Sequence, residues 1–219
     1  MRLFKDKKGF TGLEAAITLI AFITVAAVFS YVLLSAGFFS TQKGQEVVHT
    51  GVQQVSSSVE IIGSIVGYGN KTGGYLNGTT LTIQLAAGAV PIDLNKTVIT
   101  VSSPKHGWYV DLKYNKSTSL SNLKTNATGT TYGVFWVTNV NKPGDPSGAD
   151  DYLEEFEKAQ IYIDFEAIYD KVEQDFSINK PELTPNEVFL IEIKPPMGAT
   201  YPIELKVPPT IDPTMVLLQ

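Results

Sequence analysis

Five asparagines could accept a covalent glycan. Half of the chain's ten asparagines open an Asn-x-Ser/Thr sequence, the acceptor pattern for N-linked glycosylation. Asparagine, serine and threonine also gather in loops, so the pattern predicts exposed positions even where no glycan is attached. We predict that two or more of these sites carry N-linked glycans. The five candidates are Asn70, Asn77, Asn95, Asn115 and Asn126.

Catalytic chemistry has little support in the sequence. The chain has no cysteine, which excludes a disulfide framework, a thiol nucleophile and thiolate metal ligands. Of its two histidines, His49 falls beside the apolar stripe of a helical pattern, and His106 follows Ser-Pro-Lys, a turn-like context. No nucleophile-elbow motif accompanies them. We therefore predict that the protein is not an enzyme and holds no cofactor.

One acidic segment offers the oxygen ligands that calcium prefers. Asp145, Asp150, Asp151 and Glu154 lie in and just beyond the clearest loop signal, NKPGDPSGADD. A solvated acidic loop has the same composition. We expect no metal here and keep Ca²⁺ as the alternative.

A single carboxylate stands near the start of a long apolar run. Residues 15–42 contain no charged side chain, and Glu14 directly precedes them, behind Lys7 and Lys8. A charge inside a membrane helix costs about 2.5–3.5 kcal/mol, so Glu14 needs a compensating partner. A helix N-terminus stabilises an acid by about 0.3–1 kcal/mol, which is one source of compensation.

The charge of the chain is unevenly distributed. Residues 1–9 carry four basic side chains and one acidic, net +3, so the remainder of a chain whose total is −5 carries −8. Binding nucleic acid requires clustered lysine and arginine, so we expect no nucleic-acid partner. The lysines before the apolar run predict a cytoplasmic N-terminus and an external body.

The apolar run is long enough to cross a bilayer, which needs about 20 residues. Beyond it, Val48, Val52, Val55, Val59, Ile62 and Val66 are spaced alternately by three and four residues, the period of helix-on-helix packing. A cleaved secretory signal would not continue in phase into the next segment. We therefore predict one helix over residues 10–67, about 85 Å long at 1.5 Å per residue.

After residue 67 the pattern changes to short alternating runs separated by Gly, Pro, Asn and Ser. This texture predicts an α+β protein, with the long apolar helix followed by an antiparallel, immunoglobulin-like β-sandwich or barrel over residues 68–219. The apolar tail MVLLQ should be covered by other residues of the chain. The expected strands are 80–85, 97–103, 107–114, 131–138, 159–168, 187–194 and 201–207.

The segment KKGFTGLEAAITLIAFITVAAVFSYVLL, continued by SAGFFSTQKGQEVVHTGVQQVSSS, resembles the N-terminus of the archaeal flagellins, or archaellins, relatives of type IV pilins. LTPNEVFLIEIKPPMGATYPIELKVP, over residues 183–208, resembles the closing strands of the same family. Residues 70–180 resemble the family only in their pattern of short alternating runs separated by turn residues.

The resemblance implies that residues 1–9 are a class III signal peptide. A prepilin-type peptidase would cut between Gly9 and Phe10, with Lys7 and Lys8 at the cytoplasmic face. The new α-amino group of Phe10, with a reference pKa of about 7.7–8.0, would pair with Glu14 in its own or another subunit.

The resemblance further implies an extracellular archaellum filament that serves swimming. Its subunits would be copies of this chain, either alone or together with a second archaellin. The subunits would come from a precursor held in the membrane, and an assembly ATPase and a membrane platform protein would assemble them. Two alternatives stay open at this point: a type IV-like adhesion pilus subunit, and a membrane-anchored surface domain that binds a ligand.

Overall fold

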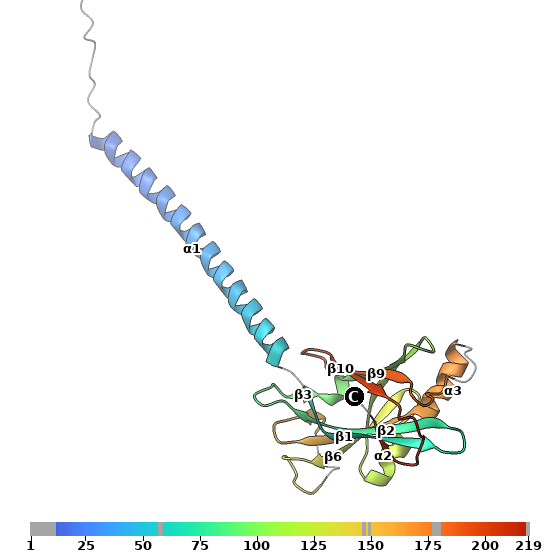
Figure 1. Cartoon of the computed structure of the whole chain (residues 1–219). Helices are drawn as coiled ribbons and strands as arrows, with labels where there is room; N and C mark the ends of the chain where they lie inside the picture. Colours follow the sequence, from blue (N-terminus) through green and yellow to red (C-terminus); the bar gives the residue numbers. More distant parts are fainter. Residues whose placement is uncertain (1–11, 57–58, 146–147, 149, 177–180, 218–219) are drawn as a thin grey trace, which may run out of the picture. The chain divides into compact units, whose positions relative to one another are not determined.

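A long helix, α1 (Gly12–Ser56), makes up most of the N-terminal part of the chain. The computed structural model describes residues 12–56, 59–145, 148, 150–176 and 181–217 (Figure 1). The chain divides into two compact units, Met1–Gly51 and Val52–Gln219. That division lies earlier than the boundary at residue 67 expected from the sequence.

The predicted helix over residues 10–67 extends too far. α1 ends at Ser56, and Val59–Asn70 form strand β1, which pairs antiparallel with β2 (Tyr75–Leu85). The spacing of Val59, Ile62 and Val66 therefore belongs to a strand. A register shift between Ile62 and Val66, with Gly63 at φ 75°, adds residues to this strand and gives it a spacing that imitates a helix. β-branched side chains, which fit a pleated sheet well, agree with the observed structure.

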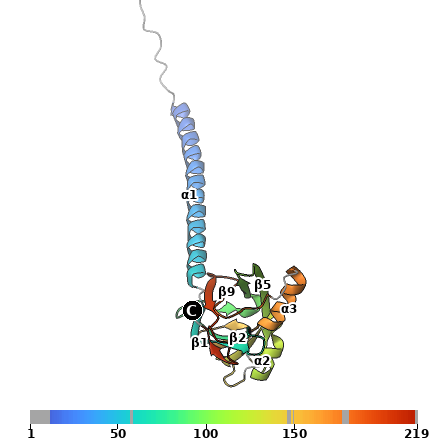
Figure 2. The same cartoon turned by 45° about the vertical axis from the view of Figure 1, so that its right-hand side comes forward.

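The second unit is built on one nine-stranded sheet in the order β10-β9-β4-β5-β6-β8-β2-β1-β11. The sheet curls around its own core, so that strands from its two ends lie on opposite sides of it (Figures 1 and 2). The remaining strands of the sheet are β4 (Val98–Ser103), β5 (Trp108–Lys116), β6 (Thr131–Thr138), β8 (Lys158–Asp164), β9 (Val188–Lys194), β10 (Tyr201–Lys206) and β11 (Met215–Val216).

The predicted fold class, a long apolar helix followed by an antiparallel β domain, is confirmed. Among the described strands one pairing differs, because β5 and β6 run parallel. A parallel pair needs a crossover connection, and here the crossover contains helix α2 (Leu120–Asn126). A small second sheet pairs β3 (Ile92–Asp93) with β7 (Tyr152–Leu153), next to the 3₁₀ turn η1 (Leu94–Lys96).

The segment 159–168 was expected to be a strand throughout, and its second half is helical. Strand β8 ends at Asp164, and helix α3 (Phe165–Phe176) begins at once. The Asp164 carboxylate accepts a hydrogen bond from the Ala167 amide at 3.1 Å, which satisfies one of the free N–H groups of the first turn. Phe165, Ile168 and Val172 then share one face, and all three are fully buried.

Aromatic side chains fill the core and most of their polar atoms have partners. Trp108, Tyr132 and Trp136 are each at most 1% exposed, whereas Tyr109 lies on the surface. Tyr132 donates to the carbonyls of Leu94 at 3.1 Å and Thr97 at 3.0 Å. These bonds tie the η1 turn to strand β6, so the aromatic core also fixes the loops around it.

The apolar tail, predicted to be covered, is covered only in part over its described residues, since Val216 is 56% exposed. Met215 and Leu217 are buried, and strand β11 pairs with β1. The Leu217 amide donates to the Ile65 carbonyl at 2.9 Å. The end of the chain thereby completes the sheet at the strand that follows the long helix.

Two turns with the same construction lead into strands β8 and β9. In each, the fourth residue is a buried glutamate whose carboxylate accepts the amide of the first residue: Glu157 from Glu154 at 3.0 Å, and Glu187 from Thr184 at 3.1 Å. The third residues have left-handed backbones, with φ 69° at Phe156 and 64° at Asn186. Each carboxylate thus closes a turn by a hydrogen bond and thereby sets where the following strand begins.

Glu187 is held by more groups than the turn itself provides. Ser103 Oγ donates to its Oε1 at 3.0 Å, and Lys105 Nζ lies 3.1 Å from its Oε2. His106 Nε2 lies 3.0 Å from Oε1 without hydrogen-bonding geometry. Burial raises the pKa of the Glu187 carboxyl, but the donors from Thr184, Lys105 and Ser103 outweigh it and hold the pKa below its usual 4.5.

Replacing Glu187 should destabilise the β domain in a pH-dependent way. Because the folded-state pKa is depressed, the carboxylate contributes its full stability above about pH 4.5, and this is lost as the pH falls through the folded value. Glu187→Gln should therefore lower the free energy of unfolding by about 1.5–3 kcal/mol at pH 7. Heat unfolding of the full chain in detergent, followed by near-ultraviolet circular dichroism, measures the difference.

The matched control is Glu204→Gln, since Glu204 is exposed on β10. This substitution should leave the unfolding temperature unchanged at pH 7 and at pH 3. A deficit of Glu187→Gln that persists undiminished at pH 3 would contradict the electrostatic explanation.

Candidate interaction surface

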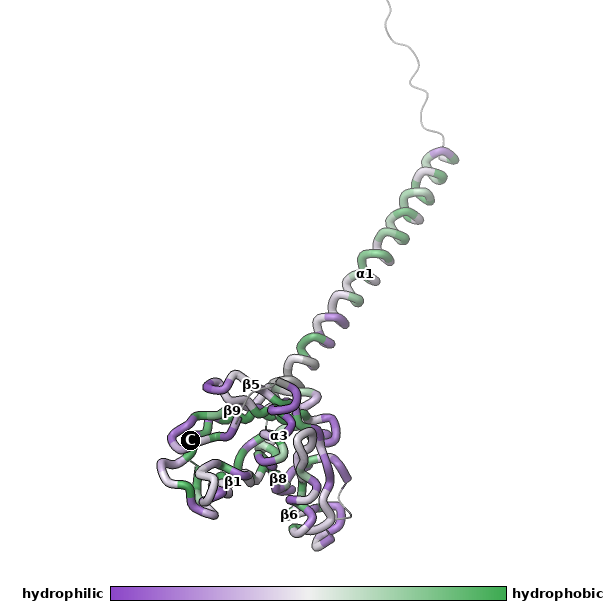
Figure 3. The backbone as a smooth tube through the Cα atoms, turned by 90° about the vertical axis from the view of Figure 1, so that its right-hand side faces the viewer, coloured by the Kyte–Doolittle hydropathy of each residue, from purple (hydrophilic) through white to green (hydrophobic). Residues whose placement is uncertain are grey.

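Helix α1 exposes an apolar surface on every side. Within the described residues, the stretch Gly12–His49 is long and apolar enough to cross a membrane and has no buried residue. Phe22 is 79% exposed, Leu13 74% and Val28 64%. Figure 3 shows the green, hydrophobic colour along most of this helix. A helix that is apolar all round must be covered by lipid or by other protein, so this surface is the candidate functional site.

The threonines of this surface satisfy their hydroxyls within the helix. Thr18 Oγ1 donates to the carbonyls of Glu14 and Ala15, Thr24 to Ala21, and Thr41 to Gly37, all at 2.9–3.0 Å. Such internal bonds remove the penalty of placing a hydroxyl in an apolar environment. The helix surface is therefore more apolar than its composition indicates.

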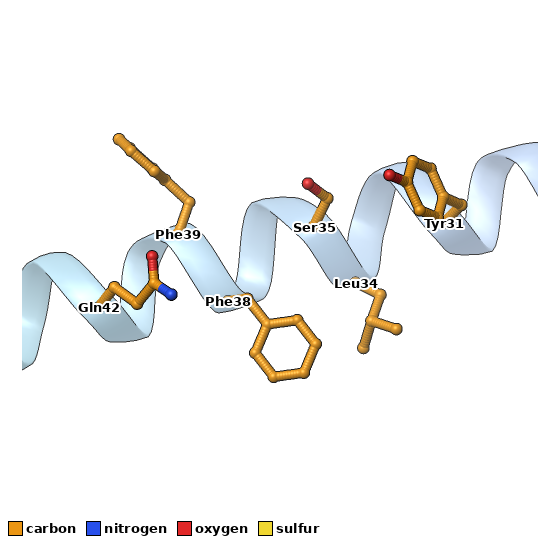
Figure 4. Close-up of a pocket in the computed structure, with 6 residues that line it drawn as sticks. All are labelled: Tyr31, Leu34, Ser35, Phe38, Phe39 and Gln42. Carbon is orange, nitrogen blue, oxygen red and sulfur yellow. The ribbon is translucent and has the colours of Figure 1, made fainter.

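Two hollows on α1 have the form that receives a side chain from another helix. One, of about 380 Å³, is lined by Thr24, Val25, Val28, Phe29 and Val32. The other, of about 390 Å³, is lined by Tyr31, Leu34, Ser35, Phe38, Phe39 and Gln42 (Figure 4). Each contains a quartet at positions i, i+3, i+4 and i+7, which is the hole of knobs-into-holes packing. The geometry suits a second helix as the covering group.

The ends of the uncharged segment have different polar environments. Glu14 lies in the first turn of α1, where the helix N-terminus favours a negative charge. At the other end Lys43 and Glu46 form an exposed ion pair, with Nζ and Oε2 2.6 Å apart. Lys7, Lys8, Gly9 and Phe10 lie outside the described residues. The predicted pairing of Glu14 with the Phe10 amine therefore stays a prediction.

The five candidate glycosylation sites differ in their surroundings. Asn95 is exposed on the η1 turn, and its side-chain amide has no hydrogen bond to any described residue. Asn70 holds a turn, since its Oδ1 accepts the amides of Thr72 at 3.1 Å and Gly73 at 3.0 Å, and its Nδ2 donates to Tyr75. Asn77 lies within strand β2, partly buried.

Asn115 and Asn126 hold the crossover between β5 and β6. Asn115 Nδ2 donates to the Asn126 carbonyl at 2.9 Å. Asn126 Nδ2 donates to the Lys116 carbonyl at 2.9 Å and to Ser117 Oγ at 3.1 Å. Both amides thus have a structural role that a glycan on the same nitrogen would disturb.

The acidic residues considered for calcium are engaged by groups of this chain. Asp150 Oδ2 accepts from Asn141 at 3.0 Å, and Asp151 Oδ1 accepts from the Tyr114 hydroxyl at 2.8 Å. The carbonyl of Asp145 accepts from Asn139 at 3.4 Å. Across the described ranges, no three acidic or histidine side chains converge as a metal site would require.

The structure adds residues that sequence reasoning did not single out. The second hollow, which lies in the predominantly apolar segment, is lined by three polar residues, Tyr31, Ser35 and Gln42. Their spacing of four and seven residues places them on one side of a helix. That spacing of polar residues within an apolar run was the available signal.

Three comparisons relate this chain to known proteins. A family model described as archaeal-type flagellin matches residues 9–205. "Probable flagellin 1" of Archaeoglobus fulgidus is 55% identical, with the alignment covering 100% of this chain and 99% of that protein.

Among solved structures, the archaeal flagellum of Methanospirillum hungatei strain JF1 is similar with a TM-score of 0.63 and 27% identity. The match covers 95% of this chain and 100% of that one. Archaeal flagellin FlaB1 of Methanocaldococcus jannaschii shares the fold, with a TM-score of 0.57 and 18% identity, over 74% of this chain and 96% of that one.

Proposed function

This chain belongs to the archaeal-type flagellins and is a structural subunit of the extracellular archaeal flagellum, and we propose that it reaches the filament through a cleaved membrane precursor. The observation that carries the proposal is the apolar surface of α1, exposed on every side. A filament subunit needs no catalytic group, and the chain is not an enzyme.

Physical chemistry supports two successive environments for α1. Before assembly, lipid covers the helix, and the basic residues 1–9 stay on the cytoplasmic side. During assembly, copies of the same helix replace the lipid. This exchange is nearly neutral in hydrophobic terms, so close packing of side chains supplies the preference for protein neighbours. Copies related by a repeated rotation and rise do not close, and they form an open helical filament.

The leader must be removed before this exchange. Lys7 and Lys8 carry charges that cannot be buried among apolar helices without partners. A membrane peptidase of the prepilin type, cutting between Gly9 and Phe10, removes them. An assembly ATPase and a membrane platform protein then supply the work of extraction and rotation, since no nucleotide-binding motif occurs in this sequence.

N-terminal sequencing of filaments sheared from cells tests the proposed route. The mature subunit should begin at Phe10, because the charged leader is incompatible with an apolar filament core. Substituting Gly9→Val, to block the cut, should leave an uncleaved protein in the membrane fraction and no filaments. Filament subunits that still begin at Met1 would contradict the cleaved precursor.

Glu14→Gln should be cut normally and assemble poorly. At 4 Å, a carboxylate and an amine attract each other by about 4 kcal/mol at an effective dielectric constant of 20, and the amide loses this attraction. We expect filament yield to fall about tenfold or more, measured as sheared filament protein per cell, with unchanged processing on denaturing gels.

Glu46→Gln is the matched control, because it replaces a glutamate by glutamine in the same helix, at an exposed position beyond the uncharged segment. Its filament yield should equal that of the unmodified chain. A normal yield from Glu14→Gln would exclude the pairing with the Phe10 amine.

Glycans are expected first at Asn95. Its amide is exposed and unbonded among the described residues, whereas the Asn126 amide donates two hydrogen bonds to the β5–β6 crossover. Mass spectrometry of peptides from purified filaments should find Asn95 modified and Asn126 bare, and Asn95→Gln should remove the mass of one glycan. An intact mass equal to the bare residues 10–219 would exclude glycosylation.

A further inference from the structure

The second hollow on α1 differs from the first in its polarity. Tyr31, Ser35 and Gln42 contribute polar groups to its lining, whereas Thr24 is the single polar residue around the first. Figure 4 shows the hydroxyls of Tyr31 and Ser35 on one flank, with Leu34 and Phe38 on the other. At 100° per residue these three polar residues fall within about 40° of each other, so they form one stripe along the helix.

These polar groups differ from the threonines in how they are satisfied. The hydroxyls of Thr18, Thr24 and Thr41 all bond to carbonyls of their own helix. The Tyr31 hydroxyl, the Ser35 hydroxyl and the Gln42 amide have no hydrogen bond to any described residue. A tyrosine hydroxyl stands too far from its own helix backbone to bond there. In an apolar environment it needs a partner from another molecule.

In the membrane precursor that partner is provided by the bilayer surface. Tyr31 lies 21 residues beyond Phe10, about 32 Å along a helix, close to the roughly 30 Å thickness of the hydrocarbon core. The hydroxyl then reaches the outer headgroup region, where tyrosines are commonly found. Once the helix leaves the lipid, this partner is lost.

We propose that Tyr31, Ser35 and Gln42 hydrogen-bond to a second copy of α1 and fix the axial register of neighbouring helices in the filament. The proposal rests on the filament function above and specifies its contact. The occupant of the hollow is a second copy, because the hollow has the i, i+3, i+4, i+7 form of helix-on-helix packing and the copies bring the same polar groups.

The position of the polar groups limits the stagger between contacting helices. From Gly12 to Phe29 the polar uncharged side chains are Thr18 and Thr24, and both are bonded internally. Serines and Gln42 that could bond to Tyr31 occur from residue 30 to residue 42, and further polar residues follow as far as Ser56. The stagger must therefore not place Tyr31 opposite residues 12–29 of its neighbour, because the tyrosine hydroxyl would then face an apolar surface. A polar residue in an apolar helix interface commonly specifies register in this way.

Tyr31→Phe tests the proposal, because it removes one hydroxyl and keeps the ring. Filaments sheared from cells should be in equilibrium with about tenfold more free subunit, and they should dissociate at a lower temperature. Thr24→Val is the matched control, since it removes a hydroxyl that already has a partner within its helix. It should behave as the unmodified chain.

The double variant Tyr31→Phe with Gln42→Leu addresses register itself. Electron cryo-microscopy of its filaments should show irregular helical symmetry, whereas filaments of the unmodified chain should show Tyr31 bonded to residues 30–42 of a neighbour. A Tyr31→Phe variant that inserts and is cut but forms no filament supports the proposal as well.

Other outcomes overturn it. Equal dissociation of Tyr31→Phe and unmodified filaments, or a Tyr31 hydroxyl facing only apolar side chains, removes the register role and leaves the filament function intact. Failure of Tyr31→Phe to enter the membrane would mean that the tyrosine acts in the bilayer instead. Failure of the unmodified chain to form filaments would remove both the function and the register role.

Discussion

The uncharged segment from Ala15 to Gln42 cannot be left in water, and this constraint governs the rest of the molecule. Burying apolar surface is favourable by about 25 cal/mol per Å², so a helix of this composition is always covered, by lipid or by protein. None of the described residues 12–49 of the helix is buried. Lipid or other protein must therefore cover the helix, and coverage by other protein requires assembly.

The β domain is built so that it does not depend on this assembly. Its core contains the large aromatic residues, and the end of the chain completes the sheet through Leu217 and Ile65. Glu157 and Glu187 fix the beginnings of strands β8 and β9 by hydrogen bonds made within the domain. A domain with a hydrophobic core of its own can be carried on a helix that exchanges one environment for another. The net negative charge outside residues 1–9 helps to keep the resulting polymer soluble.

On α1, the residues that bury the helix against a neighbour differ from the polar residues that fix its axial position. Apolar contacts alone do not choose between helices shifted along their axes, because each turn offers similar surface. The threonines do not favour any axial position either, because their hydroxyls are bonded within their own helix. Tyr31 and Gln42 carry groups that only a correctly placed neighbour satisfies, and they lie in one hollow. Stability and register thus come from different residues of the same surface.

The sequence by itself determined the apolar helix and most strands, because these depend on local patterns of apolar residues that are strong over many positions. It did not determine where the helix ends, since the bulge at Gly63 gives β1 a helix-like spacing and only pairing with β2 decides between the two. Nor did it separate Asn95 from Asn126, which have the same acceptor pattern. Their difference lies in the β5–β6 crossover, where the Asn126 amide meets Lys116 and Ser117. Such contacts join residues through the folded chain, and tertiary structure alone creates them.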